Sequence, residues 1–322
     1  MRPFAYTRPE SIEEALTLLD GETRPLAGGT DLLTLMKGEI VTPGHLVDIK
    51  RLPELSHDIA QADGAISLGS LTTLSQIEHD PLIREHLPAL GQAASLAATP
   101  QLRNMATIGG NVLQRPRCWY YRNDEVTCWL QGGDECYARG GDNRYHAIFD
   151  VSPCVAVHPS DMASVLVAYD ATIQYRDAGE HEIGVEAFFQ PPTPERRTEN
   201  VLPENAVITG ITIPTPSSSN RSVYLKAMDR KVWAFALVGV AISLEMESDT
   251  VAKANVVLSG VAPTPVRSSQ AEQLLVGSRL DAEVVALAAD AAVANAEPLQ
   301  HNGYKVPLVT ALIRQALQEA VG

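Results

Sequence analysis

The four cysteines of this 322-residue chain all fall in one segment, which begins at Ala106 and ends at Asp161. Nine, seven and seventeen residues separate them in turn, and they are Cys118, Cys128, Cys136 and Cys154. No two are close enough for the Cys-x-x-Cys knuckle of a zinc ribbon, and no closely spaced histidine pair follows. Four thiolates converging from such a segment suit a 4Fe–4S cluster, which needs cysteine ligands but imposes no single spacing. On the cysteines alone, structural zinc, two disulfides and unrelated buried thiols remain open.

The residues between the cysteines are rich in Gly, Asp, Asn and Arg and show little periodicity, so the sequence predicts a loop. Three arginines near the first cysteine could help to offset the negative charge of a thiolate-ligated cluster, namely Arg115, Arg117 and Arg122. An electron-transfer centre is therefore the chemistry that this segment suggests.

Two glycine pairs suggest a bound anion beside that centre. Gly28-Gly29 lies between an expected strand and an expected helix, and Gly109-Gly110 opens the cysteine segment. Glycines at such junctions let backbone N–H groups approach a phosphate, and a helix N-terminus adds its dipole. Neither pair is a GxGxxG or Walker A motif, and either alone is as consistent with an ordinary tight turn. Together they suggest two walls around one diphosphate.

The elements that must position these loops follow from hydrophobic periodicity. A capping box at Ser11 to Glu14 begins a helix, with a short strand around Phe4 and Tyr6 before it. Further strands are predicted at 45–49, 65–69, 172–175 and 207–213, and helices at 73–79, 87–98 and 162–171.

The pattern changes after Pro214, where the run to Asn220 is the best linker candidate in the chain. Beyond it, we expect antiparallel strands at 223–227, 238–246 and 254–261 and amphipathic helices at 280–296 and 306–320. This region therefore reads as a separate α+β domain of about a hundred residues.

Composition excludes several classes of protein. The formal net charge is −14 with no offsetting stripe of Lys and Arg, which argues against nucleic acid as a partner. No apolar run is long enough to span a bilayer, and the N-terminus lacks the apolar stretch of a secretory signal. We therefore expect a cytoplasmic protein, or a periplasmic one if it is exported already folded with a signal-bearing partner.

No GxSxG or HExxH motif is present, and we predict no catalytic acid, base or nucleophile.

Four motifs carry a resemblance that covers essentially the whole chain. They are AGGTDLL at 27–33, TIGGN at 107–111, HPSD at 158–161 and KAMDRKVWAFALVGVA at 226–241. In this order and spacing they resemble the FAD-binding medium subunit of the molybdenum hydroxylases, the xanthine dehydrogenase and aldehyde oxidoreductase family. The cysteine segment resembles the 4Fe–4S insertion of bacterial periplasmic aldehyde oxidoreductase and of 4-hydroxybenzoyl-CoA reductase. Its spacing is closer to the aldehyde oxidoreductase type.

The resemblance implies an α+β chain with two domains. Residues 1–216 would form a two-lobed FAD-binding domain of the vanillyl-alcohol-oxidase/PCMH type, with lobes at 1–54 and 55–216. The iron–sulfur insertion would occupy 114–157. Residues 221–322 would form a smaller domain of the CO-dehydrogenase flavoprotein type.

The resemblance also implies the residues that bind the cofactors. The first FAD loop would comprise Pro25, Leu26, Ala27, Gly28, Gly29, Thr30, Asp31 and Leu32, and the second Thr107, Gly109, Gly110, Asn111 and Gln114. Asp161 would lie near the ribose or adenine end, and Val207 and Ile208 would form an apolar pair beside the cofactor. Lys226 would lie near the isoalloxazine edge, where a cation raises the flavin potential. The 4Fe–4S ligands would be Cys118, Cys128, Cys136 and Cys154.

The implied function is electron transfer within a larger enzyme. A large molybdopterin-binding subunit would oxidise aldehydes to carboxylic acids, and a small 2Fe–2S subunit would pass electrons to the FAD. NAD-using relatives tend to carry acidic residues shortly after the position of Arg230, whereas Lys231, Val232 and Trp233 follow here. Ferredoxin, quinone or dioxygen are therefore better candidate acceptors than nicotinamide. The alternatives are the flavin subunit of a 4-hydroxybenzoyl-CoA reductase-like or xanthine dehydrogenase-like enzyme, a stand-alone flavin oxidase, and a zinc-binding scaffold.

Overall fold

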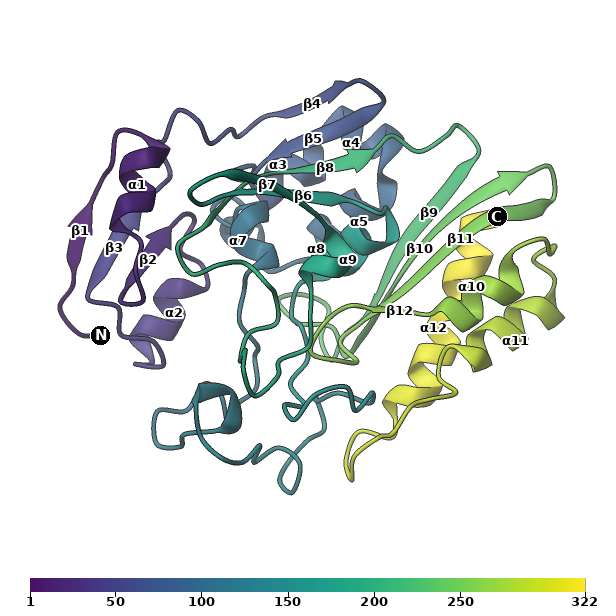
Figure 1. Ribbon diagram of the computed structural model, residues 1–322. Helices are drawn as coiled ribbons and strands as arrows, with labels where there is room; N and C mark the ends of the chain where they lie inside the picture. Colours follow the sequence, from purple (N-terminus) through teal and green to yellow (C-terminus); the bar gives the residue numbers. More distant parts are fainter. Residues whose placement is uncertain (322) are drawn as a thin grey trace.

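In the computed structural model, which describes residues 1–321, the chain begins with a small lobe built on a three-stranded parallel sheet. Its strand order is β1-β3-β2, so the second strand of the chain lies at one edge. The lobe is at the left of Figure 1. Its elements are β1 (Ala5–Thr7), α1 (Ile12–Leu18), β2 (Thr23–Leu26), α2 (Leu32–Lys37) and β3 (His45–Asp48).

The predicted capping box of α1 forms only in part. The Ser11 hydroxyl accepts the Glu14 N–H at 3.1 Å, as expected for an N-cap. The Glu14 carboxylate, however, accepts the N–H of Glu10 at 2.8 Å and not that of Ser11. A complete capping box is formed instead by Thr73 and Gln76 at the start of α3.

The second lobe is a five-stranded antiparallel sheet in the order β4-β5-β8-β6-β7. The strands are β4 (Ile59–Ala62), β5 (Ala65–Gly69), β6 (Thr172–Arg176), β7 (Glu180–Gly184) and β8 (Val207–Pro214). The helices are α3 (Leu74–His79), α4 (Pro81–His86), α5 (Pro88–Leu96), α6 (Pro100–Arg103), α7 (Ile108–Val112), α8 (Asp161–Ala168) and α9 (Val185–Phe188). The apolar faces of α3, α5, α7 and α8 share one core with the inner faces of β5, β6 and β8.

The C-terminal region is a four-stranded antiparallel sheet in the order β12-β11-β10-β9, followed by helices. The strands are β9 (Asn220–Ala227), β10 (Val238–Glu247), β11 (Thr250–Ser259) and β12 (Val266–Arg267). The helices are α10 (Ser269–Leu275), α11 (Ala282–Ala291) and α12 (Lys305–Val321). Of these elements, the sequence did not predict β12 and α10, just as it missed β4, β7, α4, α6, α7 and α9 in the second lobe. They are short, and periodicity needs a longer window.

Both faces of the C-terminal sheet are buried, so its packing is not that of an isolated domain. Val240 and Ile242 of β10 point toward α11 and α12, whereas Ala241 between them joins the core of the second lobe. Alternate residues of a strand point to opposite faces, and a sheet covered on both sides therefore reads as a continuous apolar run. Figure 1 shows the sheet between α5 and α8 on one side and α10, α11 and α12 on the other.

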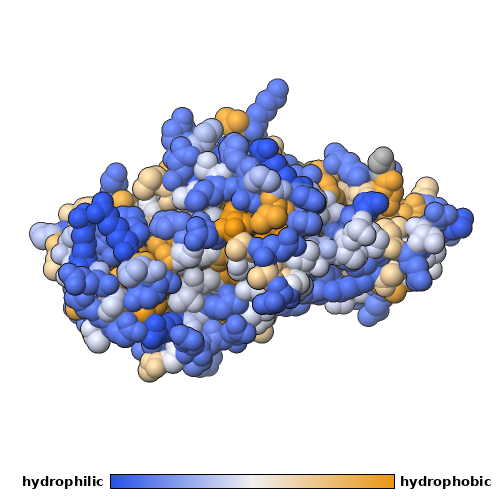
Figure 2. Space-filling model, turned by 90° about the horizontal axis from the view of Figure 1, so that it is seen from above, coloured by the Kyte–Doolittle hydropathy of each residue, from blue (hydrophilic) through white to orange (hydrophobic). Residues whose placement is uncertain are grey.

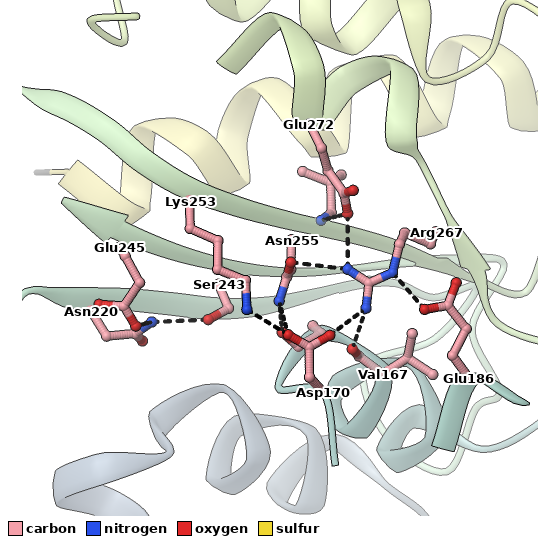
Figure 3. A network of polar contacts seen from close by, with 12 residues as sticks. Val167, Asp170, Glu186, Asn220, Ser243, Glu245, Lys253, Asn255, Arg267 and Glu272 are labelled. Carbon is pink, nitrogen blue, oxygen red and sulfur yellow. Dashed lines mark hydrogen bonds and ion pairs between the residues drawn. The ribbon is translucent and has the colours of Figure 1, made fainter. Parts of the chain in front are cut away.

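A polar network reinforces this junction (Figure 3). The Arg267 guanidinium on β12 contacts Asp170 at 2.7 Å, Glu186 at 2.8 Å and Glu272 at 3.2 Å. It also donates to the carbonyl oxygen of Val167 at 2.9 Å, at the end of α8. The C-terminal sheet and the second lobe are therefore joined by charge as well as by apolar contact.

The segment from residue 113 to residue 160 is irregular, as predicted, apart from one turn of 3₁₀ helix, η1 (Trp129–Gln131). In Figure 1 it forms the loops below the two lobes. Within residues 1–321, no helix is long and apolar enough to cross a membrane. The face seen in Figure 2 is mostly hydrophilic, with some apolar residues exposed near its middle.

Candidate cofactor site

A cavity of about 500 Å³ lies where the small lobe, the second lobe and the irregular segment meet. Four stretches of chain line it, from within 24–49, 70–71, 106–121 and 197–208. It is open on one side and combines backbone of the glycine loops with apolar side chains. Such a mixed, concave site is typical of one that holds a large cofactor.

Gly28 lies where the two predicted loops touch. A Cβ atom built on Gly28 would overlap the carbonyl oxygen of Met105, which immediately precedes the second loop. Gly29 has a φ of +71°, in the left-handed region that favours glycine. The first glycine pair therefore lets backbone meet backbone and turns the chain from β2 into α2.

The second glycine pair forms the first turn of α7. Thr107 caps this helix, and its hydroxyl accepts the N–H of Gly110 at 3.2 Å. The N–H of Gly109 donates to the carbonyl oxygen of Ser70 at 3.0 Å, which fixes the loop against β5. A Cβ on Gly110 would meet only the Thr107 hydroxyl oxygen, at 3.0 Å. The two glycine pairs thus form adjacent walls of one cavity.

Fifteen of the seventeen predicted FAD-binding residues line this cavity. They are Pro25, Leu26, Ala27, Gly28, Gly29, Thr30, Asp31, Leu32, Thr107, Gly109, Gly110, Asn111, Gln114, Val207 and Ile208. The glycines and the amide side chains form the small and polar part of the cavity wall. Val207 and Ile208 form its apolar part. Backbone of the glycine loops suits a diphosphate, and an apolar wall suits the flat rings of FAD.

Asp161 and Lys226 do not line the cavity. They form an ion pair with 2.7 Å between Lys226 Nζ and Asp161 Oδ2, and their side chains are 1% and 6% exposed. The Tyr224 hydroxyl also donates to Asp161, at 2.6 Å. Burial and the Asp161 charge raise the pKa of Tyr224 well above its ordinary value.

The resemblance places Asp161 near the ribose or adenine end of FAD and Lys226 near the isoalloxazine edge, and both placements stay predictions. The structure adds that the two side chains contact each other. Asp161 follows Ser160, whose hydroxyl hydrogen-bonds to Asn111 on the cavity wall at 2.5 Å. The ion pair therefore braces that wall from behind.

The arginines near the first cysteine bond to Asp31 and Glu199. Arg117 and Arg122 contact the Asp31 carboxylate at 2.9 and 2.8 Å, and the backbone N–H of Arg115 donates to it at 2.9 Å. The Arg115 guanidinium pairs with buried Glu199 at 3.2 Å. The irregular segment is thus fastened to the first glycine loop.

Several lining residues were not predicted because no local pattern marks them. Arg197 lies in the Pro- and charge-rich loop before β8, and it donates to the carbonyl oxygen of Gly133 at 2.8 Å. Its guanidinium also lies over the Trp129 ring, 4.7 Å from the centroid. Further unpredicted lining residues are Arg24, Ser70, Leu71, Arg115, Arg117, Tyr121, Thr198 and Asn200. Their only signal in the sequence was proximity to a predicted loop or to the cysteines.

All four cysteines lie in one cluster beside the cavity, and none is in a disulfide. Cys128 and Cys154 are buried, and Cys118 and Cys136 are partly exposed. A hydrogen bond with the Cys154 thiol lowers the pKa of Cys136 to about 6. Burial raises the pKa of Cys118 to about 12. Because all four cysteines are free thiols, the structure does not support the alternative of two disulfides.

The cysteine cluster does not have the geometry of a single-ion site. Within residues 1–321, no three His, Cys, Asp or Glu side chains are grouped so as to hold one metal ion. A single zinc ion would bring its sulfur ligands to about 2.3 Å from one centre. Four thiols are the donor type that a 4Fe–4S cluster requires, but residues 1–321 show no preformed metal-binding group.

His158, which follows the cysteine segment, gives this region a predictable pH dependence. It is buried among apolar and cationic neighbours, and burial, with the nearby Arg117 charge, lowers its pKa to about 3. An unfolded histidine has a pKa of about 6.5. The contribution of neutral His158 to stability is therefore complete above pH 6.5 and is lost as the pH falls toward 3.

We expect the His158→Gln variant to show a weaker acid dependence of the free energy of unfolding. Between pH 6.5 and 5, wild type should lose about 2 kcal/mol through this residue, at about 1.4 kcal/mol per pH unit. Urea unfolding at both pH values measures the difference. His301→Gln, at an exposed position, is the matched control. Equal acid dependence in wild type and His158→Gln would contradict the assignment.

Comparison with known proteins agrees with this geometry. Residues 2–216 match the family described as the FAD binding domain in molybdopterin dehydrogenase, and residues 223–320 match the CO dehydrogenase flavoprotein C-terminal domain. The chain is 33% identical to the aldehyde oxidoreductase FAD-binding subunit PaoB of Escherichia coli (strain K12), over 99% of each chain. It is 28% identical to the carbon monoxide dehydrogenase medium chain of Hydrogenophaga pseudoflava, over 98% of this chain and 96% of that one.

A solved structure of carbon monoxide dehydrogenase from Hydrogenophaga pseudoflava superimposes with a TM-score of 0.79 at 28% identity, covering 99% of this chain and 98% of that one. The predicted α+β fold class and the predicted family are therefore confirmed. The chain belongs to the family of FAD-binding medium subunits of the molybdenum hydroxylases, which includes the carbon monoxide dehydrogenases and aldehyde oxidoreductases.

Proposed function

We propose that this subunit holds FAD in the cavity between its two lobes, with the diphosphate between the glycine loops. Gly28 and Gly29 would offer backbone N–H groups, and Gly109 and Gly110, whose N–H groups bond to Ser70 and Thr107, would let the second loop approach the diphosphate closely. Val207 and Ile208 would contact the flat rings. FAD, when bound, supplies the capacity to take up electrons and pass them on. The residues of this chain bind it, orient it and exclude water, and none acts as an acid, base or nucleophile.

We further propose that Cys118, Cys128, Cys136 and Cys154 ligate one 4Fe–4S cluster. The observation that carries this proposal is the gathering of four unpaired thiols in one cluster against the cavity. Leu35 of α2 packs in the same cluster and also lines the cavity, so the two sites share a wall. A second redox centre beside FAD suits a subunit that relays electrons.

The substrate chemistry would take place on partner chains. Aldehyde oxidation is the reaction that we propose for the assembly, because the relative with 33% identity is named an aldehyde oxidoreductase subunit. A large molybdopterin-binding chain and a small 2Fe–2S chain would complete it. Ferredoxin or another carrier would accept the electrons, since Lys231, Val232 and Trp233 follow Arg230 in place of acidic residues.

The test is to purify the tagged chain anaerobically at native expression and to quantify flavin, iron, zinc and co-purifying subunits. We expect one FAD and about four irons per chain, as this cluster type requires, together with a large and a small partner. Stoichiometric zinc and no iron would refute the cluster. A fully active, iron-free monomer would refute the assembly and favour a stand-alone flavin oxidase.

A further inference from the structure

His146 contacts the first cysteine of the cluster. Its Nε2 atom lies 3.1 Å from Cys118 Sγ, and its side chain is buried. Trp119 packs edge-on against the imidazole, with 5.7 Å between ring centroids, and Tyr120 lies 6.3 Å away. The ring is therefore held in place by aromatic neighbours, with one nitrogen directed at the sulfur.

The surroundings of the other ring nitrogen, Nδ1, indicate which of the two nitrogens of His146 carries the proton. Nδ1 of His146 is buried and has no hydrogen-bond partner among the residues that the structure describes. An N–H group there would be a buried donor without an acceptor, which costs about 1–3 kcal/mol. The favoured tautomer therefore carries its proton on Nε2, which then donates to the sulfur of Cys118.

The backbone of His146 is anchored from the C-terminal domain. Lys305, at the first residue of α12, is fully buried and donates to the carbonyl oxygens of Tyr145 and His146 at 3.0 Å each and of Gly260 at 2.7 Å. The Asn302 amide also donates to the His146 carbonyl oxygen, at 3.2 Å. The three hydrogen bonds from this buried amine fix the backbone of the loop that carries His146.

No other side-chain N–H or O–H group in residues 1–321 hydrogen-bonds to these four sulfurs. The remaining contacts to them come from backbone N–H groups and from the pairing of Cys136 with Cys154. His146 is thus an added donor at one ligand only. His146 does not line the FAD cavity.

We propose that His146 is a positioning residue that sets the reduction potential of the cluster through its N–H···S hydrogen bond to Cys118. The inference rests on the proposed 4Fe–4S cluster. Hydrogen bonds to ligand sulfurs favour the reduced, more negative state and raise the potential. His146 therefore keeps the cluster easier to reduce than four buried thiolates alone would, which suits exchange of electrons with the flavin.

The test compares His146→Phe, His146→Gln and the exposed control His301→Leu, each purified with its partners. The midpoint potential is measured by EPR-monitored redox titration, with iron content determined on the same samples. Phenylalanine keeps the ring but removes the donor, so its potential should shift to a more negative value. Glutamine restores an N–H donor, so its potential should return toward wild type, and His301→Leu should not differ from wild type.

An unchanged potential in His146→Phe at full iron content would overturn the inference and leave the cluster proposal intact. Absence of iron from wild type would instead refute the cluster itself. Should His146→Phe fail to accumulate the cluster, wild type labelled with ¹⁵N-histidine decides the question. Pulsed EPR of its reduced cluster should detect coupling to a histidine nitrogen, and lack of that coupling would rule out the hydrogen bond.

Discussion

Replacing Gly28 by alanine should abolish FAD binding, whereas the same change at exposed Gly44, which does not line the cavity, should preserve it. The new methyl group at Gly28 would overlap the Met105 carbonyl oxygen, which belongs to the backbone and cannot rotate away. The two cavity walls must then separate. At Gly44 an added Cβ atom would meet nothing within 4 Å.

The expected loss for Gly28→Ala is at least about 100-fold in affinity for FAD, equivalent to about 3 kcal/mol. The flavin absorbance of each purified variant, followed by titration of the flavin-free protein with FAD, measures it. Circular dichroism confirms that both variants are folded. Full flavin retention in folded Gly28→Ala would show that the two loops do not need this close approach, and the proposed position of the diphosphate would be wrong.

The glycine loops illustrate what the sequence could and could not predict. The first pair was identified from its place between an expected strand and an expected helix, and the second from its place at the start of the cysteine segment. The reason that Gly28 must be glycine is its contact with Met105, seventy-seven residues later in the chain. A contact of that kind leaves no pattern in either segment.

The same limit applies to charged residues. The sequence placed three arginines near the first cysteine and assigned them to the cluster, but two of them neutralise Asp31 on the opposite loop. Likewise, Lys226 was predicted to lie near the flavin, but its ion pair with Asp161 was not foreseen. Residue type and position predict that a charge needs a partner, whereas the partner itself depends on the tertiary fold.

The elements that pack against the C-terminal sheet could also not be predicted from the sequence. Its three long strands were predicted within a few residues, since their apolar runs are long. Those runs also indicate burial on both faces. They do not reveal that α5 and α8, from the preceding domain, cover one of the faces.

Replacing Cys136 by serine should remove most of the iron and, through the arginine contacts, weaken FAD binding. A serine hydroxyl is a poor substitute for a thiolate in an iron–sulfur cluster, and the segment around it has little regular structure to keep its shape. Arg117 and Arg122 would then hold Asp31 less firmly, and Asp31 begins α2 at the cavity wall. We expect about a tenfold weaker affinity for FAD, equivalent to about 1.4 kcal/mol.

A double-mutant cycle tests the route of this coupling. Asp31→Asn removes the carboxylate charge that both arginines contact and keeps the size of the side chain. If the cluster acts on FAD through this carboxylate, Cys136→Ser should weaken FAD binding much less in the Asp31→Asn background than in wild type. Iron content and FAD affinity of the four proteins give the answer. Substitutions at independent sites have additive effects on the free energy of binding, whereas substitutions in one network do not. Additive effects of Cys136→Ser and Asp31→Asn on FAD affinity would therefore show that the cluster and the glycine loop are independent.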